Sequence, residues 1–169
     1  RRHSLEPNDT GPVPLYSVVG GKLTTSRSLA EETAATVLNR IGLPRAVDSR
    51  DRPLPGAEDY PADAAAVQTR RQEIADAGGW DPATVTAAWS LWGTRAEQVL
   101  STIATDDTAE RELIYGTNLP RGLARWAIRE EWVRTLPDLV ERRLMLLYRR
   151  ELTRRTLEEL ASLLVEEGI

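Results

Sequence analysis

Apolar residues recur at helical spacing along most of the second half of the chain. After Pro61, positions three and four residues apart carry Leu, Val, Ala and Trp, with charged residues between them. Such spacing places the apolar side chains on one face of a helix, which can pack against other helices. The pattern predicts helices over residues 63–77, 81–91, 94–104, 122–134, 136–150 and 153–167. No convincing strand is predicted in this region, so we expect an all-α bundle.

Turn and capping residues mark the ends of several of these helices. Gly78 and Gly79 are expected to stop one helix, and Asp81-Pro82 gives the next an N-cap followed by proline at the first helical position. Capping-box spacing, a threonine followed three residues later by glutamate, occurs at Thr94-x-x-Glu97 and at Thr156-x-x-Glu159.

The first 42 residues show a different pattern. Residues 1–14 are polar, contain three prolines and read as a loop. Residues 15–19, Leu-Tyr-Ser-Val-Val, have the aromatic and β-branched composition of a strand. After a Gly-Gly-Lys sequence, apolar residues at helical spacing predict a helix of about sixteen residues that ends at Gly42.

These patterns divide the chain into three parts. Residues 43–61 contain four more prolines and are the best linker candidate. We therefore expect an arm over 1–42, a proline-rich linker over 43–61 and a helical domain over 62–169. The predicted fold is an all-α bundle preceded by a strand–Gly-Gly-Lys–helix arm.

Composition places the chain among soluble globular proteins and narrows its chemistry. Of the 169 residues, 41% are hydrophobic and 28% are charged, and no apolar run approaches the roughly 20 residues that span a bilayer. The absence of cysteine leaves no disulfide and no thiolate nucleophile, and a single histidine leaves little scope for a metal centre. The formal net charge of −4 does not favour non-specific binding to nucleic acid.

The charge is distributed unevenly, which suggests an alternative function. Residues 121–155 contain ten arginines and five acidic residues. A basic helical surface favours an interaction module that binds an acidic partner or a membrane surface. Trp126 and Trp132 interleave with these arginines, but a buried stripe explains them better than nucleic-acid binding does. We expect no nucleic-acid partner.

The Gly-Gly-Lys sequence is the candidate binding site. Gly20 and Gly21 carry no Cβ, so a ligand can approach the main chain closely. Thr24 or Thr25 can cap the following helix, whose N-terminal end carries partial positive charge, and Lys22 adds a full charge there. A short sequence of this kind is also typical of a plain turn, so the residues alone leave both interpretations open.

Several motifs along nearly the whole chain resemble FAD-dependent glycerol-3-phosphate dehydrogenases. The sequence from Gly20 to Arg27 resembles the flavin-contacting loop of that family, with Ser26 in place of the usual tyrosine. Arg1-Arg2-His3 resembles an Arg-x-His element that precedes the loop. The remaining motifs are Leu54-Pro55-Gly56-Ala57, Trp92-Gly93-Thr94, and Glu131 followed by Asp138, Arg142 and Arg143, with Leu144 in place of a threonine.

The resemblance implies a function and a set of site residues. It implies the C-terminal part of an enzyme that oxidises glycerol 3-phosphate to dihydroxyacetone phosphate and passes electrons to quinone, with an oxidase that uses oxygen as the nearest alternative. It assigns cofactor (FAD) contacts to Gly20, Gly21, Lys22, Thr24 and Thr25 and a catalytic role to Lys22. The resemblance leaves open whether Lys22 serves the flavin or the substrate phosphate.

The resemblance also implies a substrate contact and partners. It implies that Arg1 binds the phosphate group of the substrate. The remaining flavin domain would lie upstream, so we expect this chain to be inactive alone and the strand over residues 15–19 to lack sheet partners. The resemblance further implies a cytoplasmic enzyme, associated peripherally with the inner membrane face, and allows a dimer.

Overall fold

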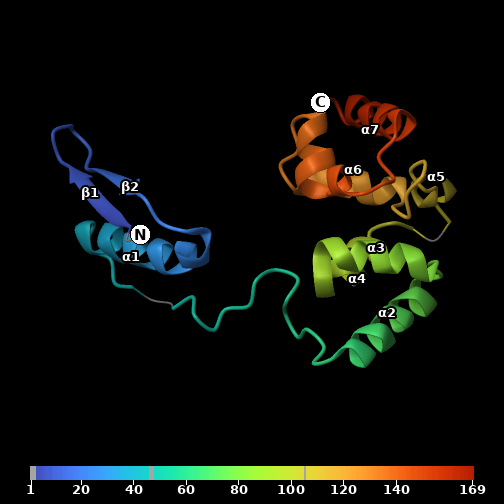
Figure 1. Cartoon of the computed structure of the whole chain (residues 1–169), viewed down its shortest axis with the longest axis horizontal. Coiled ribbons are helices and arrows are strands. Elements are labelled where there is room, and N and C mark those ends of the chain that lie inside the picture. The colour runs from blue at the N-terminus through green and yellow to red at the C-terminus, as the bar shows by residue number, and fades with distance from the viewer. Residues whose placement is uncertain (1–2, 46–47, 105) are drawn as a thin grey trace. The chain divides into compact units, whose positions relative to one another are not determined.

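The structure is a computed structural model that describes residues 3–45, 48–104 and 106–169 (Figure 1). It contains two compact units, Arg1–Arg52 and Pro53–Ile169, which are described separately below.

The first unit is a β-hairpin followed by a helix. Strand β1, Ser4–Asn8, pairs antiparallel with β2, Leu15–Val19, with Ser4 opposite Val19. A 3-10 turn over Leu23–Thr25 leads into helix α1, Ser26–Arg40. None of the described residues of this unit is buried.

The hairpin corrects two expectations. Residues 4–8 were expected to be part of a loop, and the strand over 15–19 was expected to lack a partner, yet β1 and β2 pair along their whole length. Pro7 accounts for the first error, because proline marks a break in a central strand but is tolerated at the edge of a sheet. Because no strand was predicted over residues 4–8, the strand over residues 15–19 was expected to have no partner.

The second unit confirms the prediction of an all-α bundle. Its α-helices are α2 Ala64–Gly78, α3 Pro82–Trp92, α4 Ala96–Ser101, α5 Thr108–Arg111, α6 Arg121–Glu130 and α7 Arg154–Glu166. Shorter turns cover Gly93–Arg95, Asp138–Arg143 and Leu146–Tyr148. None of the described helices combines the length and the apolar character that a bilayer crossing requires.

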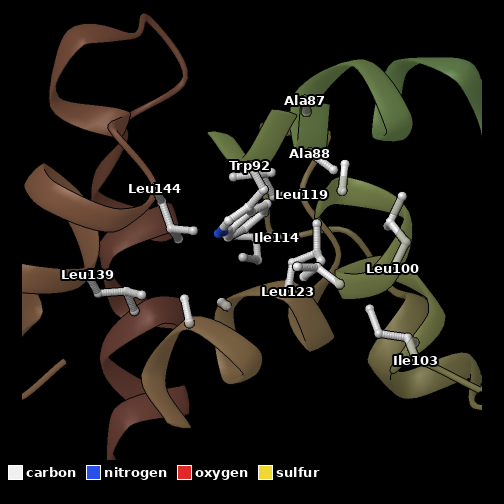
Figure 2. Close-up of a cluster of buried hydrophobic side chains, with 14 of the residues drawn as sticks. Ala87, Ala88, Trp92, Leu100, Ile103, Ile114, Leu119, Leu123, Leu139 and Leu144 are labelled. Carbon is white, nitrogen blue, oxygen red and sulfur yellow. The ribbon is translucent and has the colours of Figure 1, made fainter. Parts of the chain in front are cut away.

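The helices of this unit enclose one apolar core. Leucines from several elements meet there, including Leu100, Leu123, Leu139 and Leu144, each almost completely buried (Figure 2). Trp92 packs edge-on against Trp126, with 5.5 Å between the ring centroids. Burial of these side chains removes apolar surface from water, which is the main stabilising contribution to such a bundle.

Several predicted helix ends are confirmed by the caps. The side chains of Asp63 and Asp81 accept hydrogen bonds from the backbone N–H groups of Ala66 and Ala83, as N-caps of α2 and α3. Gly79 ends α2 in the left-handed conformation. The cap at Asp81 and the helix end at Gly79 are predicted correctly because they depend only on neighbouring residues. The cap at Asp63 was not predicted, although the start of its helix was.

Two predicted helices and two predicted caps are wrong. The helix predicted over 94–104 is a 3-10 turn followed by α4, and Thr94 forms no side-chain cap. Helix α7 is capped by the pair Thr153 and Thr156 instead of the predicted Thr156-x-x-Glu159 box.

The segment predicted as a helix over 136–150 is also different. It contains a π-helical turn over Asp138–Arg143, after which Met145 adopts a left-handed φ of 53° and a 3-10 turn follows. Trp132, expected in a buried stripe, has a φ of 57° and is 84% exposed.

The motif with Glu131, Asp138 and the two arginines has a structural role. Glu131 accepts a hydrogen bond from Trp92 Nε1 at 2.8 Å through its side chain and one from Arg143 Nε at 2.7 Å through its backbone carbonyl. Arg142 Nη1 lies 2.6 Å from Asp138 Oδ1. These contacts fasten the end of α6 to α3 and to the π-helical turn.

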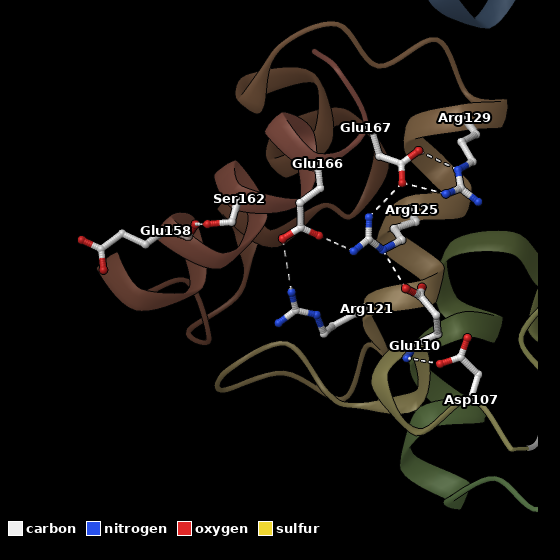
Figure 3. A network of polar contacts seen from close by, with 9 residues as sticks. All are labelled: Asp107, Glu110, Arg121, Arg125, Arg129, Glu158, Ser162, Glu166 and Glu167. Carbon is white, nitrogen blue, oxygen red and sulfur yellow. Dashed lines mark hydrogen bonds and ion pairs between the residues drawn. The ribbon is translucent and has the colours of Figure 1, made fainter.

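A charged network joins α6 to the end of α7 (Figure 3). Arg125, which is 17% exposed, forms ion pairs with Glu110, Glu166 and Glu167. Arg129 Nε lies 2.6 Å from Glu167 Oε2. The hydrogen bonds from Arg129 and then those from Arg125 lower the pKa of Glu167, although its partial burial acts in the opposite direction.

The Glu167 network predicts a loss of stability in acid. The pKa of Glu167 is lower in the folded protein than in the unfolded chain, where glutamate titrates near about 4.3. Its contribution to the free energy of unfolding is therefore present above that pH and is lost as the pH falls through the folded-state pKa. We expect Glu167→Gln to reduce the free energy of unfolding by roughly 1–2 kcal/mol at pH 7 and to have little effect near pH 2.

Urea unfolding at a series of pH values measures this difference. Glu141→Gln is the matched control, because Glu141 is exposed and its carboxylate forms no ion pair or hydrogen bond with a described residue. An equal loss for Glu167→Gln at pH 7 and at pH 2 would contradict the electrostatic explanation.

Candidate functional site

The register of the hairpin brings His3 next to the Gly-Gly-Lys loop, defined here as residues 20–25. Because Ser4 lies opposite Val19, the preceding His3 lies at the same end of the hairpin as Gly20. A Cβ on Gly21 would lie 3.7 Å from His3 Cβ and 3.7 Å from Leu29 Cδ2. The loop is therefore placed between the first strand and α1.

The loop has a backbone conformation that requires its glycines. Gly20 has a φ of 78° and Gly21 a φ of 101°, both in the left-handed region. Lys22 returns to an extended conformation, with φ −125° and ψ 152°, and precedes the 3-10 turn. The chain thus reverses sharply between β2 and the start of α1.

The loop presents unpartnered hydrogen-bond donors. Within the described ranges, the backbone N–H groups of Gly21, Leu23 and Thr24 have no hydrogen-bond partner. The Lys22 side chain likewise forms no ion pair with a described residue. Free N–H groups, the positive end of a helix and an ammonium group at one place suit an anion or an electron-rich oxygen.

Not all of the predicted contact residues are equally available. Thr24 is exposed and its hydroxyl is free of contacts within the described chain. The Thr25 hydroxyl accepts a hydrogen bond from the Lys22 N–H at 3.3 Å and donates one to the Lys22 carbonyl at 3.0 Å, so it shapes the loop. Arg1, the predicted phosphate ligand, lies outside the described residues. The roles assigned to Gly20, Gly21, Lys22, Thr24, Thr25 and Arg1 stay predictions.

Beyond the loop, a loop segment after α1 binds the exposed side of that helix. Glu31 accepts hydrogen bonds from the Ser49 hydroxyl at 2.5 Å and the Ser49 N–H at 2.8 Å, which lower its pKa to about 2. Arg27 donates to the Ser49 hydroxyl at 3.2 Å. Arg27, which belongs to the loop motif, is thus held by the following segment.

Sequence reasoning missed one interaction at the site. His3 Nε2 lies 2.9 Å from Glu32 Oε2, so the first strand is bonded to α1 beside Gly21. No local sequence signal predicts this pair, because it depends on the hairpin register. In the described ranges, no group of three or more His, Cys, Asp or Glu side chains is arranged to hold a metal ion.

A known protein family matches the helical unit. Residues 47–168 match the family described as the C-terminal domain of alpha-glycerophosphate oxidase. The matched range covers almost the whole helical unit and more than half of the chain.

Three curated proteins are similar to the chain. D-erythritol 1-phosphate dehydrogenase of Brucella abortus is 28% identical over 144 residues, which are 85% of this chain and 28% of that protein. Glycerol-3-phosphate dehydrogenase of Pseudomonas aeruginosa is 30% identical over 138 residues, 79% of this chain and 25% of that protein. Anaerobic glycerol-3-phosphate dehydrogenase subunit A1 of Haloferax volcanii is 34% identical over 100 residues, which are 59% of this chain and 16% of that protein. The chain therefore spans little more than a quarter of these relatives, or less.

Proposed function

Because the chain belongs to the family of the C-terminal domain of alpha-glycerophosphate oxidase, we propose that it is the C-terminal part of an FAD-dependent glycerol-3-phosphate dehydrogenase. The observation that carries the proposal is the Gly-Gly-Lys loop in a chain whose helical unit matches that family. The loop presents Lys22 and backbone N–H groups that have no partner among the described residues. Two relatives carry glycerol-3-phosphate dehydrogenase in their names.

The loop fits one edge of a flavin. The left-handed Gly20 and Gly21 carry no side chain that would block a planar ring. The N–H groups of Leu23 and Thr24, which bond to no described residue, can donate to it. FAD, when bound, would supply the group that accepts a hydride. Reduced flavin gathers negative charge, and a cation with helix N-terminal dipoles stabilises such charge in a site that excludes water.

In this function, each part of the loop has one task. Gly20 and Gly21 let the main chain approach the ring, and Thr24 offers a free hydroxyl at its edge. Lys22 supplies positive charge, either to the reduced flavin or to the phosphate of glycerol 3-phosphate. Arg1 is proposed as a further ligand of that phosphate, since a guanidinium group matches phosphate oxygens bidentately.

The proposal extends to the electron acceptor and to the location. We propose quinone as the acceptor in a cytoplasmic enzyme that contacts the inner membrane face and forms a dimer. Oxygen is the alternative acceptor, because the family description names an oxidase. The names of the relatives contain the word dehydrogenase instead.

The rival function, an arginine-rich interaction module, is less well supported. Most of the arginines between 121 and 155 form ion pairs, and several of their partners lie outside that segment. Arg125 and Arg129 face Glu167, and Arg155 lies over the ring of Tyr115 and near Glu159. The basic excess of the segment is therefore largely neutralised within the fold.

The experiment is to express the longer natural polypeptide that contains this chain and measure its absorbance and activity. We expect a bound flavin that glycerol 3-phosphate bleaches, and reduction of a soluble quinone analogue. D-erythritol 1-phosphate, named in the Brucella abortus relative, is the comparison substrate. Hydrogen peroxide formation in place of quinone reduction would favour the oxidase, and a polypeptide without flavin would contradict the proposal.

A further inference from the structure

The hairpin of the first unit is fastened to α1 by two polar contacts. At one end, His3 Nε2 lies 2.9 Å from Glu32 Oε2, and the side chains are 23% and 62% exposed. At the other end, Arg40 Nη2 lies 3.2 Å from Asp9 Oδ1. Of these two contacts, the His3–Glu32 pair is the one that lies beside the Gly-Gly-Lys loop.

His3 and Leu29 flank Gly21. A side-chain atom of His3 and one of Leu29 each lie at ordinary contact distance, 3.7 Å, from the position that a Gly21 Cβ would take. His3 stands on the strand side of the loop and Leu29 on α1. The bond to Glu32, on the same helix as Leu29, holds these two sides together across the glycine.

Glycine needs such support more than any other residue. Two consecutive glycines have the largest conformational freedom of any dipeptide, and fixing the backbone of one residue costs roughly 1–2 kcal/mol. Donors that are already in place when a charged ligand binds avoid this cost at the time of binding. A contact that orders Gly20 and Gly21 therefore also fixes the donors that follow them, at Lys22, Leu23 and Thr24.

We propose that His3 and Glu32 form a positioning pair for the Gly-Gly-Lys loop. Their bond keeps Gly21 between β1 and α1, and thereby keeps the Lys22 ammonium group and the free N–H groups in one arrangement toward a bound anion. The identity of that anion, a reduced flavin or a substrate phosphate, rests on the proposed function. The effect of the pair on the order of the loop does not.

The first experiment uses this chain alone. Backbone ¹⁵N relaxation of Gly20, Gly21 and Lys22 is compared in the wild type, in His3→Ala, in Glu32→Ala and in the double variant. We expect order parameters near about 0.85 in the wild type and below about 0.6 in all three variants. The chain has a single histidine, so its imidazole signals need no further assignment, and the His3–Glu32 bond can be followed directly.

Two controls separate the pair from general changes. Glu6→Ala removes an exposed carboxylate from β1 that forms no contact with a described residue, and it should leave the loop ordered. Glu32→Gln keeps an oxygen that accepts the imidazole N–H, and it should restore most of the order. Loop order that is the same in His3→Ala and in the wild type would overturn the proposal.

The second experiment uses the longer flavoprotein. His3→Ala and Glu32→Ala should each lower kcat/KM for glycerol 3-phosphate by about tenfold, since small displacements of a positioned group cost ten- to hundredfold. The double variant should be no worse than either single variant, because the two residues act as one unit. Additive losses would overturn the proposal. Wild-type protein without flavin or activity would instead contradict the proposed function and leave the relaxation result standing.

Discussion

Gly93→Ala is expected to destabilise the helical unit strongly. Gly93 has a φ of 57° and a ψ of −134°, and an added Cβ would lie 2.0 Å from the carbonyl oxygen of Gly56. The same oxygen accepts the Thr94 N–H at 3.0 Å, so neither backbone segment can move without losing this bond. Backbone strain and overpacking together cost about 3 kcal/mol or more, a large part of the roughly 5–15 kcal/mol that stabilises an ordinary domain.

Urea unfolding followed by circular dichroism measures the loss. Gly168→Ala is the matched control, because Gly168 has a φ of 80° but nothing lies within 4 Å of its added Cβ. That variant carries only the cost of a left-handed alanine, about 1 kcal/mol. If Gly93→Ala and Gly168→Ala lower the free energy of unfolding by the same amount, the close approach of the backbones at Gly56 and Gly93 is not what destabilises Gly93→Ala.

Lys22→Met is expected to slow the longer flavoprotein about a hundredfold while leaving its fold intact. Lys22 is exposed and bonds to no described residue through its side chain, so its removal takes away charge and little packing. Loss of one preorganised electrostatic contact lowers the rate by about this factor. If Lys22 serves the flavin, the reduction potential should fall, because the cation that favours the reduced anion is gone.

Three measurements on this variant separate the roles of the lysine. A lower reduction potential with little change in KM identifies a flavin contact. A steep rise in KM for glycerol 3-phosphate at an unchanged potential identifies a phosphate ligand. Lys22→Arg keeps the positive charge and should retain most of the potential. If Lys22→Met changes none of these quantities, Lys22 is a surface residue and the functional interpretation of the loop is wrong.

Local sequence signals predicted the helical bundle well and the hairpin poorly. The caps at Asp63 and Asp81 depend on residues within the first helical turn, so the chain specifies them without reference to the rest of the fold. The strand over residues 4–8 exists through its pairing with 15–19, and Pro7 concealed it. A contact between segments has no signature in either segment alone.

The π-helical turn shows a second limit of periodicity. Leu139, Val140 and Leu144 are buried, as an amphipathic helix would require. Over so few residues, i→i+4 and i→i+5 hydrogen bonding can bury the same side chains, so apolar spacing does not distinguish the two geometries. The left-handed conformation of Met145, which ends the segment, could not be predicted either, because residues other than glycine rarely adopt it.

The candidate loop was predicted from residues that are adjacent in the chain. Gly20, Gly21 and the helix that follows them are a local pattern, and the structure places them in one reversal of the chain. The side-chain cap predicted for this helix does not form. The His3–Glu32 contact joins residues 29 positions apart and requires the hairpin register. The sequence therefore predicted where a ligand could bind, but not what holds the binding loop in place.

The backbone crossing at Gly56 and Gly93 limits how the sequence can diverge. A Cβ on either residue would meet the backbone of the other segment, at 2.4 Å from the Trp92 oxygen or 2.0 Å from the Gly56 oxygen. Any descendant that keeps the crossing must keep both glycines, and one that loses a glycine must rebuild the path of the linker as well. The two positions should therefore vary together across lineages, although 37 residues separate them in the chain.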